Sequence, residues 1–145
     1  MIVNAPLLSA LGAWFLAQVI KLPVEYWQSN KWRWHLLLSP GGMPSSHAAL
    51  ICGLAWTVGL ANCFNSSVFA ITFILAMVVI YDALGVRRAA GEHARVINRM
   101  IKDLAHGHPL KQKELRELLG HTPRQILIGI VFGVLVSWAF WLWLS

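Results

Sequence analysis

The sequence contains few charged side chains. Asp, Glu, Lys and Arg make up 12 % of its 145 residues, whereas apolar residues make up 57 %. A soluble domain carries about 25 % charged residues, so this chain has roughly half the charge that a water-facing surface needs. The shortage excludes an ordinary soluble domain. It predicts an integral membrane protein, and the length predicts a single membrane-embedded domain over residues 1–145.

Acidic residues and cysteines are scarce as well. The formal charge is +6, and the basic residues lie between apolar segments rather than on one polar face. This placement excludes a nucleic-acid partner and favours anionic membrane lipids or a phosphorylated substrate. Cys52 and Cys63 are separated by about 16 Å along one helix, too far for a disulfide. His106 and His108 have no cysteine or carboxylate set beside them, so we expect neither a metal nor a cofactor.

Four apolar segments are present, and a span needs about 20 residues. They predict an all-α integral membrane helical bundle with about four transmembrane helices. Their approximate bounds are Ala5 to Ile20 (with room to extend to Tyr26), His47 to Leu60, Val68 to Val86 and Gln125 to Leu144.

The basic residues predict the orientation of the chain. Every Lys and Arg lies between the first and second segments, or between or flanking the third and fourth. The positive-inside rule places both basic loops in the cytoplasm. We expect a bacterial inner (plasma) membrane protein whose site faces the cytoplasm. The long loop should contain short interfacial helices, because residues 88–104 have one polar and one apolar face, and residues 110–119 form a second amphipathic piece.

Polar residues gather at the predicted inner ends of all four segments. Lys21 closes the first segment, and the stretch "GGMPSSH" (41–47) opens the second. Arg87 and Arg88 close the third segment, and His121 opens the fourth. Cations and the free N–H groups of a helix start bind phosphate oxygens, and two histidines can divide the roles of nucleophile and general acid. The pattern predicts phosphate chemistry at the cytoplasmic interface.

Three stretches in order carry a family resemblance. "GGMPSSHAAL", "YDALGVRRAAGEHA" and "LGHTPRQILIGIVFG" closely resemble the divergent branch of the type-2 phosphatidic acid phosphatase superfamily, which is related to vanadium-dependent haloperoxidases. The superfamily motif Pro-Ser-Gly-His is matched by Pro44, Ser45, Ser46 and His47, which implies that His47 is the general acid. The tail of a later motif is matched from His121, which implies that His121 attacks phosphorus.

The resemblance also implies which residues bind the substrate. The phosphate-binding set would be Lys21, Ser45, Ser46, Arg87 and Arg88. Which of the two arginines contacts phosphate stays open, and Lys21 could instead be a membrane anchor. Gln125 stands where the superfamily has Asp, so Asp82 or Glu92 would be the alternative orienting group. His93 is a competing nucleophile, because it follows Arg87 at the superfamily's usual spacing.

These residues support one functional hypothesis and one alternative. The hypothesis is a metal-independent lipid phosphate phosphatase, a phosphoric monoester hydrolase, that acts through a phosphohistidine at the cytoplasmic interface. Its substrate would be a polyprenyl or glycerolipid phosphate (or diphosphate). The alternative is a catalytically inactive membrane protein that binds anionic lipid or a partner, which the glutamine at Gln125 favours. Four spans are few for enclosing a site, so we also expect a homodimer.

Overall fold

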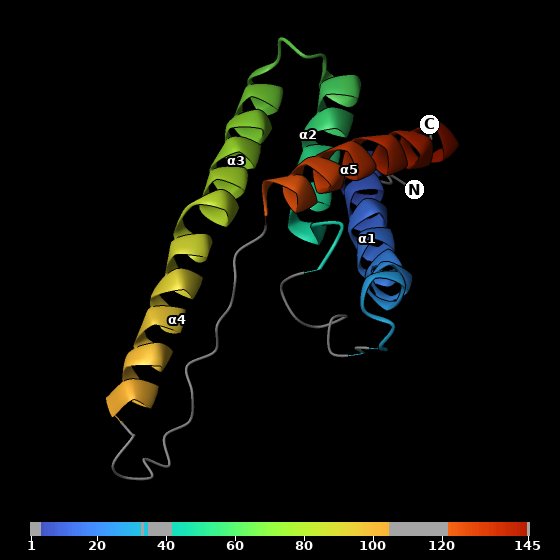
Figure 1. Cartoon of the computed structure of the whole chain (residues 1–145). Helices are drawn as coiled ribbons and strands as arrows, with labels where there is room; N and C mark the ends of the chain where they lie inside the picture. Colours follow the sequence, from blue (N-terminus) through green and yellow to red (C-terminus); the bar gives the residue numbers. More distant parts are fainter. Residues whose placement is uncertain (1–3, 33, 35–41, 105–121, 145) are drawn as a thin grey trace.

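The structure is a computed structural model that describes residues 4–32, 34, 42–104 and 122–144. The described residues form five α-helices and no strands, which confirms the all-α prediction. Figure 1 shows their arrangement. The helices are α1 (Ala5–Ser29), α2 (Ser46–Asn62), α3 (Ser67–Leu84), α4 (Val86–Leu104) and α5 (Pro123–Leu144).

Short polar side chains begin the helices of the bundle. Asn4 accepts a hydrogen bond from the Leu7 N–H at 3.1 Å. Ser45 and Ser66 do the same at the starts of α2 and α3. These side chains satisfy N–H groups that have no partner inside the helix. These three helices therefore begin at residues that their sequences mark.

The spans are close to the predicted segments. Three helical stretches in the described part are long and apolar enough to cross a membrane: Ala5–Trp27, Ser67–Lys102 and Pro123–Leu144. The second of these joins α3 to most of α4. The helix α2 has 17 residues, which is the lower limit for a span. The predicted first segment does extend past Ile20, because α1 continues to Ser29.

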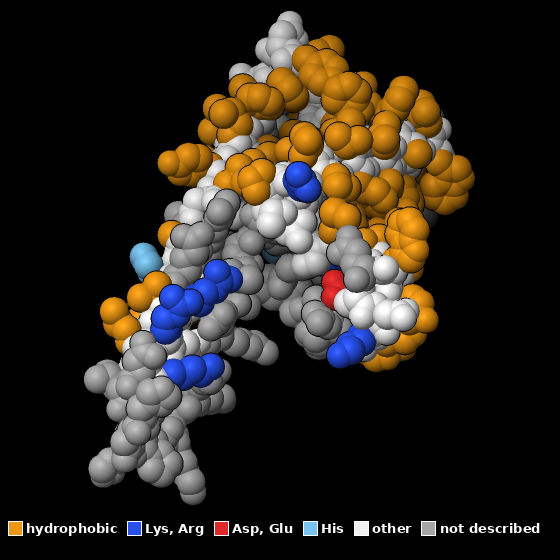
Figure 2. Space-filling view, in the orientation of Figure 1, with side chains coloured by type: hydrophobic (Ala, Val, Ile, Leu, Met, Phe, Trp, Pro, Cys, Tyr) orange, Lys and Arg blue, Asp and Glu red, His pale blue; other side chains and the backbone are white. Residues whose placement is uncertain are grey.

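Large apolar side chains cover much of the outer surface. Figure 2 shows them over the upper part of the molecule, and on α3 the exposed fractions reach 68 % for Ile71 and 77 % for Tyr81. A soluble monomer rarely exposes so large a contiguous apolar surface. Contact with lipid accounts for it, so these faces are the lipid-facing sides of a membrane bundle.

The helix directions follow from contacts at their two ends. Thr57 near the end of α2 donates a hydrogen bond to the Pro6 carbonyl at the start of α1, at 3.4 Å. At the opposite ends, Lys21 of α1 donates to Ser46 of α2. Therefore α1 and α2 are antiparallel. The short turn at residues 63–66 makes α2 and α3 antiparallel as well.

Small residues let α5 lie directly against α2, and the two helices run in the same direction. A Cβ added at Gly129 would lie 2.6 Å from the Ser45 carbonyl oxygen, and one at Gly133 would lie 2.4 Å from the Ala49 backbone. Further along, Gly53 faces Ser137 in the same way. Small residues at such spacing allow close helix packing in a membrane, where no hydrophobic effect drives association.

This arrangement brings four helix termini to one end of the bundle: the end of α1, the start of α2, the end of α3 and the start of α5. The helix α4 continues α3 almost without a break and extends away from the bundle (Figure 1). Only Gly85 separates them, and the hydrogen-bonded ladder passes through it. The helix predicted over 88–104 is confirmed as part of α4, whereas its position at the membrane interface stays a prediction. The piece predicted at 110–119 lies outside the described residues.

Aromatic side chains mark the same end of α1. Tyr26 stacks on Trp32 with ring centroids 4.8 Å apart, and Trp32 stacks on Trp34 at 5.5 Å. Trp27 is 91 % exposed. Amphipathic rings prefer the boundary between hydrocarbon and water, so this cluster indicates the membrane interface beside the four termini.

Candidate functional site

Lys21 lies at the end of a small-residue face of α1. Ser9, Ala13 and Ala17 precede it at intervals of four residues, and all three are fully buried. The same face continues to Lys21, which is 1 % exposed. Because residues four apart lie on one helix face, the pattern that packs α1 into the bundle also directs the lysine inward. Lys21 is therefore a buried residue of the site end rather than a lipid-facing anchor.

The ammonium group of Lys21 reaches the first residue of α2. Its Nζ donates to the Ser46 Oγ at 3.1 Å and to the Gln18 Oε1 on its own helix. The stem of Lys21 passes beside Gly42, where an added Cβ would lie 3.6 Å from Cδ. Gly42 has φ of +76°, a conformation that glycine adopts without strain. The glycine thus serves the turn that leads into α2.

The recorded partners of this lysine are neutral oxygens. Among the described residues, the Lys21 Nζ contacts Gln18 and Ser46 and no carboxylate. A charge taken out of water costs several kcal/mol unless it is paired, and lysines at membrane depth usually have a functional partner. The environment of Lys21 therefore favours an additional anion.

Ser45 and Ser46 are both 1 % exposed. The Ser45 Oγ accepts from the Ala48 N–H at 3.4 Å, which is the N-cap of α2. His47 follows them and is exposed. A cavity of about 10 Å³ lies between Ser45, His47 and Ala83. It has room for about one water molecule, so a larger group could reach His47 only from its exposed side.

The start of α5 is tied to the start of α2. The Ser45 N–H donates to the Gln125 carbonyl at 3.2 Å. The Gln125 side chain accepts from the Thr122 N–H at 2.9 Å, and the Gln125 N–H donates to the Thr122 Oγ1 at 3.4 Å. This reciprocal pair is a capping box, and Thr122-x-x-Gln125 is its sequence signal. Gln125, predicted as an orienting group, thus stabilises the helix start.

The other predicted residues fall into two groups. Asp82 is half-buried in the last turn of α3, next to Ala83, which lines the small cavity beside His47. Arg87, Arg88 and Glu92 lie on α4, and the positions of their side chains are outside the described part. His121 also lies outside the described residues, directly before Thr122 in the sequence.

His93, the competing nucleophile, lies on the part of α4 that leaves the bundle. It is exposed and seven residues beyond the first residue of α4, which corresponds to about 10 Å along the helix. Among the described residues, α4 makes its main helix contacts with α3. His93 therefore lies on a different element from Lys21, which is on α1 and contacts Ser46, and from His47, which is in the first turn of α2.

Gln18 is the site residue that the sequence reading missed. Its only signal was its position three residues before Lys21, one turn back on the same helix. No group of three or more His, Cys, Asp or Glu side chains that could hold a metal occurs among the described residues. The site as described consists of a cation, two hydroxyls, a histidine and a helix N-terminus.

An all-helical membrane bundle with this cluster at one end defines the class of protein: a membrane protein with a polar site at its interface. The chain belongs to the divergent PAP2 family, which it matches over residues 2–136. It is also similar to the uncharacterized membrane protein YuiD of Bacillus subtilis (strain 168). The two are 43 % identical over 148 residues, covering 94 % of each chain. No solved structure matches the chain.

Proposed function

We propose that this protein is a metal-independent lipid phosphate phosphatase whose site faces the cytoplasm. The observation that carries the proposal is the buried Lys21 ammonium, which donates to Ser46 at the N-terminus of α2 and has neutral partners among the described residues. A helix N-terminus attracts anions, and a neighbouring cation strengthens that attraction. A phosphate group is the anion that membership of a PAP2-type family suggests.

The reaction would proceed in two steps. An imidazole nitrogen of His121 attacks phosphorus, the bond to the lipid oxygen breaks, and His47 gives its proton to the departing alkoxide. A water molecule then loses a proton to His47 and attacks the phosphohistidine, which releases inorganic phosphate and frees His121. The cationic and hydroxyl groups stabilise the charge that develops on the phosphoryl oxygens.

The positions of the helix termini support these roles. His47 is in the first turn of α2, and His121 is covalently joined to Thr122, the cap of α5. The bond from the Ser45 N–H to the Gln125 carbonyl ties those two helix starts together. Because the Gln125 oxygen already accepts from Thr122, we assign the orienting of an imidazole to Asp82 rather than to Gln125. Arg87 or Arg88 would add a second cation.

The first experiment is a phosphate-release assay on the purified protein in lipid micelles, with a panel of lipid phosphates and with chelator present. Release from at least one lipid supports the proposal. A protein that binds these lipids and releases no phosphate would be the inactive lipid-binding alternative, which the capping role of Gln125 favours.

The second experiment separates the histidines by trapping a labelled phosphoenzyme from an aryl phosphate. His121→Ala should abolish both turnover and trapped label. His47→Ala should slow lipid hydrolysis about 10²- to 10⁴-fold, the usual range for general acid–base help. It should still trap label, because an aryl oxide leaves without a proton. His93→Ala is the matched control and should behave like the native chain. Label on His121→Ala but not on His93→Ala would make His93 the nucleophile.

A further inference from the structure

Gln18 is half-buried on α1, one turn before Lys21. Its side-chain oxygen Oε1 accepts a hydrogen bond from the Lys21 Nζ, which also donates to the Ser46 Oγ at 3.1 Å. Side chains in a helix lean toward its N-terminus. This lean explains why the Lys21 Nζ bonds to Gln18 and not to Glu25, the carboxylate four positions after it. The contacts from Gln18 through Lys21 to Ser46 thus connect α1 to the start of α2.

These two contacts fix the position of the ammonium group. A lysine side chain has many rotamers, and holding it in one of them costs conformational entropy. Acceptors on two different helices hold the Lys21 Nζ in one place. An ammonium group has three N–H donors and a hydroxyl has one O–H donor. Gln18 and Ser46 each accept one bond from Lys21, so a third ammonium donor and the Ser46 proton can serve an oxygen of a bound anion.

The neutrality of Gln18 decides how much positive charge this group of side chains presents. Glutamate has the same length and also offers an oxygen at Oε1, but it is negatively charged. Three residues before a lysine on a helix, a glutamate forms an ion pair with it, and a paired lysine attracts a further anion far less. The amide of Gln18 holds the Lys21 ammonium through an oxygen and leaves its charge uncompensated by that contact.

We propose that Gln18 is a positioning residue of the anion site. It holds the Lys21 ammonium at the start of α2 and, because it is neutral, keeps the positive charge available to a phosphate group. The inference rests on the proposed function for the identity of the anion. It adds a residue that acts through Lys21 rather than by contact with the substrate.

The test compares Gln18→Glu with Gln18→Met in the full-length protein in nonionic detergent micelles. Titration calorimetry measures the binding of inorganic phosphate and vanadate, and thermal unfolding without anion measures stability. Gln18→Glu should unfold at the native temperature or above it, because an ion pair forms, yet it should bind phosphate about 100-fold more weakly. Gln18→Met keeps the charge and loses only the acceptor, so it should bind phosphate about three- to tenfold more weakly and unfold below the native chain.

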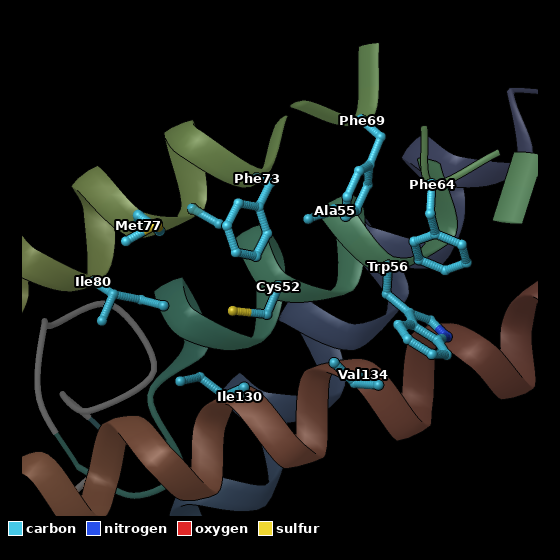
Figure 3. A pocket seen from close by; sticks show the side chains of 11 residues that line it. Cys52, Ala55, Trp56, Phe64, Phe69, Phe73, Met77, Ile80, Ile130 and Val134 are labelled. Carbon is cyan, nitrogen blue, oxygen red and sulfur yellow. The ribbon is translucent and has the colours of Figure 1, made fainter. Parts of the chain in front are cut away.

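Two control variants account for changes in net charge and in stability elsewhere. Lys31→Met lowers the net charge by one unit, as Gln18→Glu does, at an exposed position beyond α1. Val134→Ala removes packing from an apolar groove, a cavity of about 410 Å³ that is lined by α2, α3, α5 and the turn between α2 and α3. Figure 3 shows this groove with Val134 on α5 and Phe73 on α3. Both controls should bind phosphate as the native chain does.

A double substitution tests whether Gln18 acts through the lysine. In a Lys21→Met chain the ammonium is absent, so adding Gln18→Met should change the phosphate affinity no further. A further loss of about threefold or more would mean that Gln18 contacts the anion directly, which overturns the positioning assignment.

The outcomes separate this inference from the phosphatase proposal. If the native chain and both Gln18 variants bind phosphate equally well, the positioning role is wrong and the anion site stands. Weaker binding by Gln18→Met than by Gln18→Glu would show that only the oxygen acceptor matters, which also overturns the inference. The expected order of affinities without phosphate release from any lipid supports the inference and makes the protein an inactive anion binder. A native chain that binds neither phosphate nor vanadate overturns both.

Discussion

Replacing Lys21 with methionine should separate phosphate binding from folding. Methionine has a similar length and no charge, so the substitution keeps most of the packing around a residue that is 1 % exposed. It removes the hydrogen bonds from Nζ to Ser46 and Gln18. It also removes a buried cation whose partners among the described residues are the neutral side chains of Ser46 and Gln18. The two effects act in opposite directions on the free energy of unfolding.

The balance can be worked out from these contacts. A buried Ser46 hydroxyl that loses its donor costs about 1–3 kcal/mol, and the exchange of a buried charge for an apolar side chain commonly stabilises by about 1–4 kcal/mol. Without phosphate, Lys21→Met should therefore unfold at the native temperature or slightly above it. With phosphate, the lost charged hydrogen bond, about 1.5–3 kcal/mol, should weaken binding about 10- to 150-fold.

The assay is thermal unfolding in detergent micelles, with and without inorganic phosphate or vanadate, together with phosphate release. Lys31→Met is the matched control, because Lys31 is exposed and lies just beyond the end of α1. This substitution should change neither the unfolding temperature nor phosphate release. The reasoning would be refuted if Lys21→Met unfolds far below the native chain in the absence of anion while its phosphate affinity is unchanged. Lys21 would then be part of a structural network.

Three further results are expected. Gly133→Ala should destabilise the bundle by about 1–3 kcal/mol, because the added Cβ meets the Ala49 backbone, which cannot move aside. Gly59→Ala is the control and should cost less, because its Cβ meets only the ring of the exposed Phe64. Equal melting temperatures of the two variants would contradict the close α2–α5 packing. Phosphate release should survive chelator and be inhibited by vanadate, whereas strict magnesium dependence would exclude the histidine mechanism. In cells that express a chain without its native cysteines, a cysteine placed at Asn65 should react with an external reagent and one at Gln112 should not; the opposite result would invert the topology.

The class of fold was predictable from the sequence. The shortage of charge and the four apolar segments predict a helical membrane bundle. In hydrocarbon an apolar segment has to form a helix, because a helix satisfies all of its backbone N–H and C=O groups internally. Proline or serine near the starts of α1, α2, α3 and α5 places those four boundaries within a few residues of the observed ones. A helix after Gly85 was predictable from the polar face of Arg95, Arg99 and Lys102, but its direct continuation of α3 was not.

The clustering of the helix termini was only partly predictable. The distribution of Lys and Arg placed four ends on one side of a membrane, but it could not say which ends touch. That depended on Gly129 and Gly133, which let α5 approach the α2 backbone. The contact joins Ser45 to Gln125, and no local pattern in either segment specifies it.

Local chemistry was determined by the sequence alone: a serine-capped helix start, a histidine in its first turn, and a lysine four residues beyond a series of small residues. The tertiary structure decided the environment of each group. It buried Lys21 against Ser46, left His47 exposed, and used Gln125 to cap α5. It also opened a groove beside them, because α3 and α5 both pack on α2 and hardly meet each other. These outcomes depend on contacts between residues far apart in the chain. For such contacts the packing of whole helices, rather than local conformational preference, determines the free energy of folding.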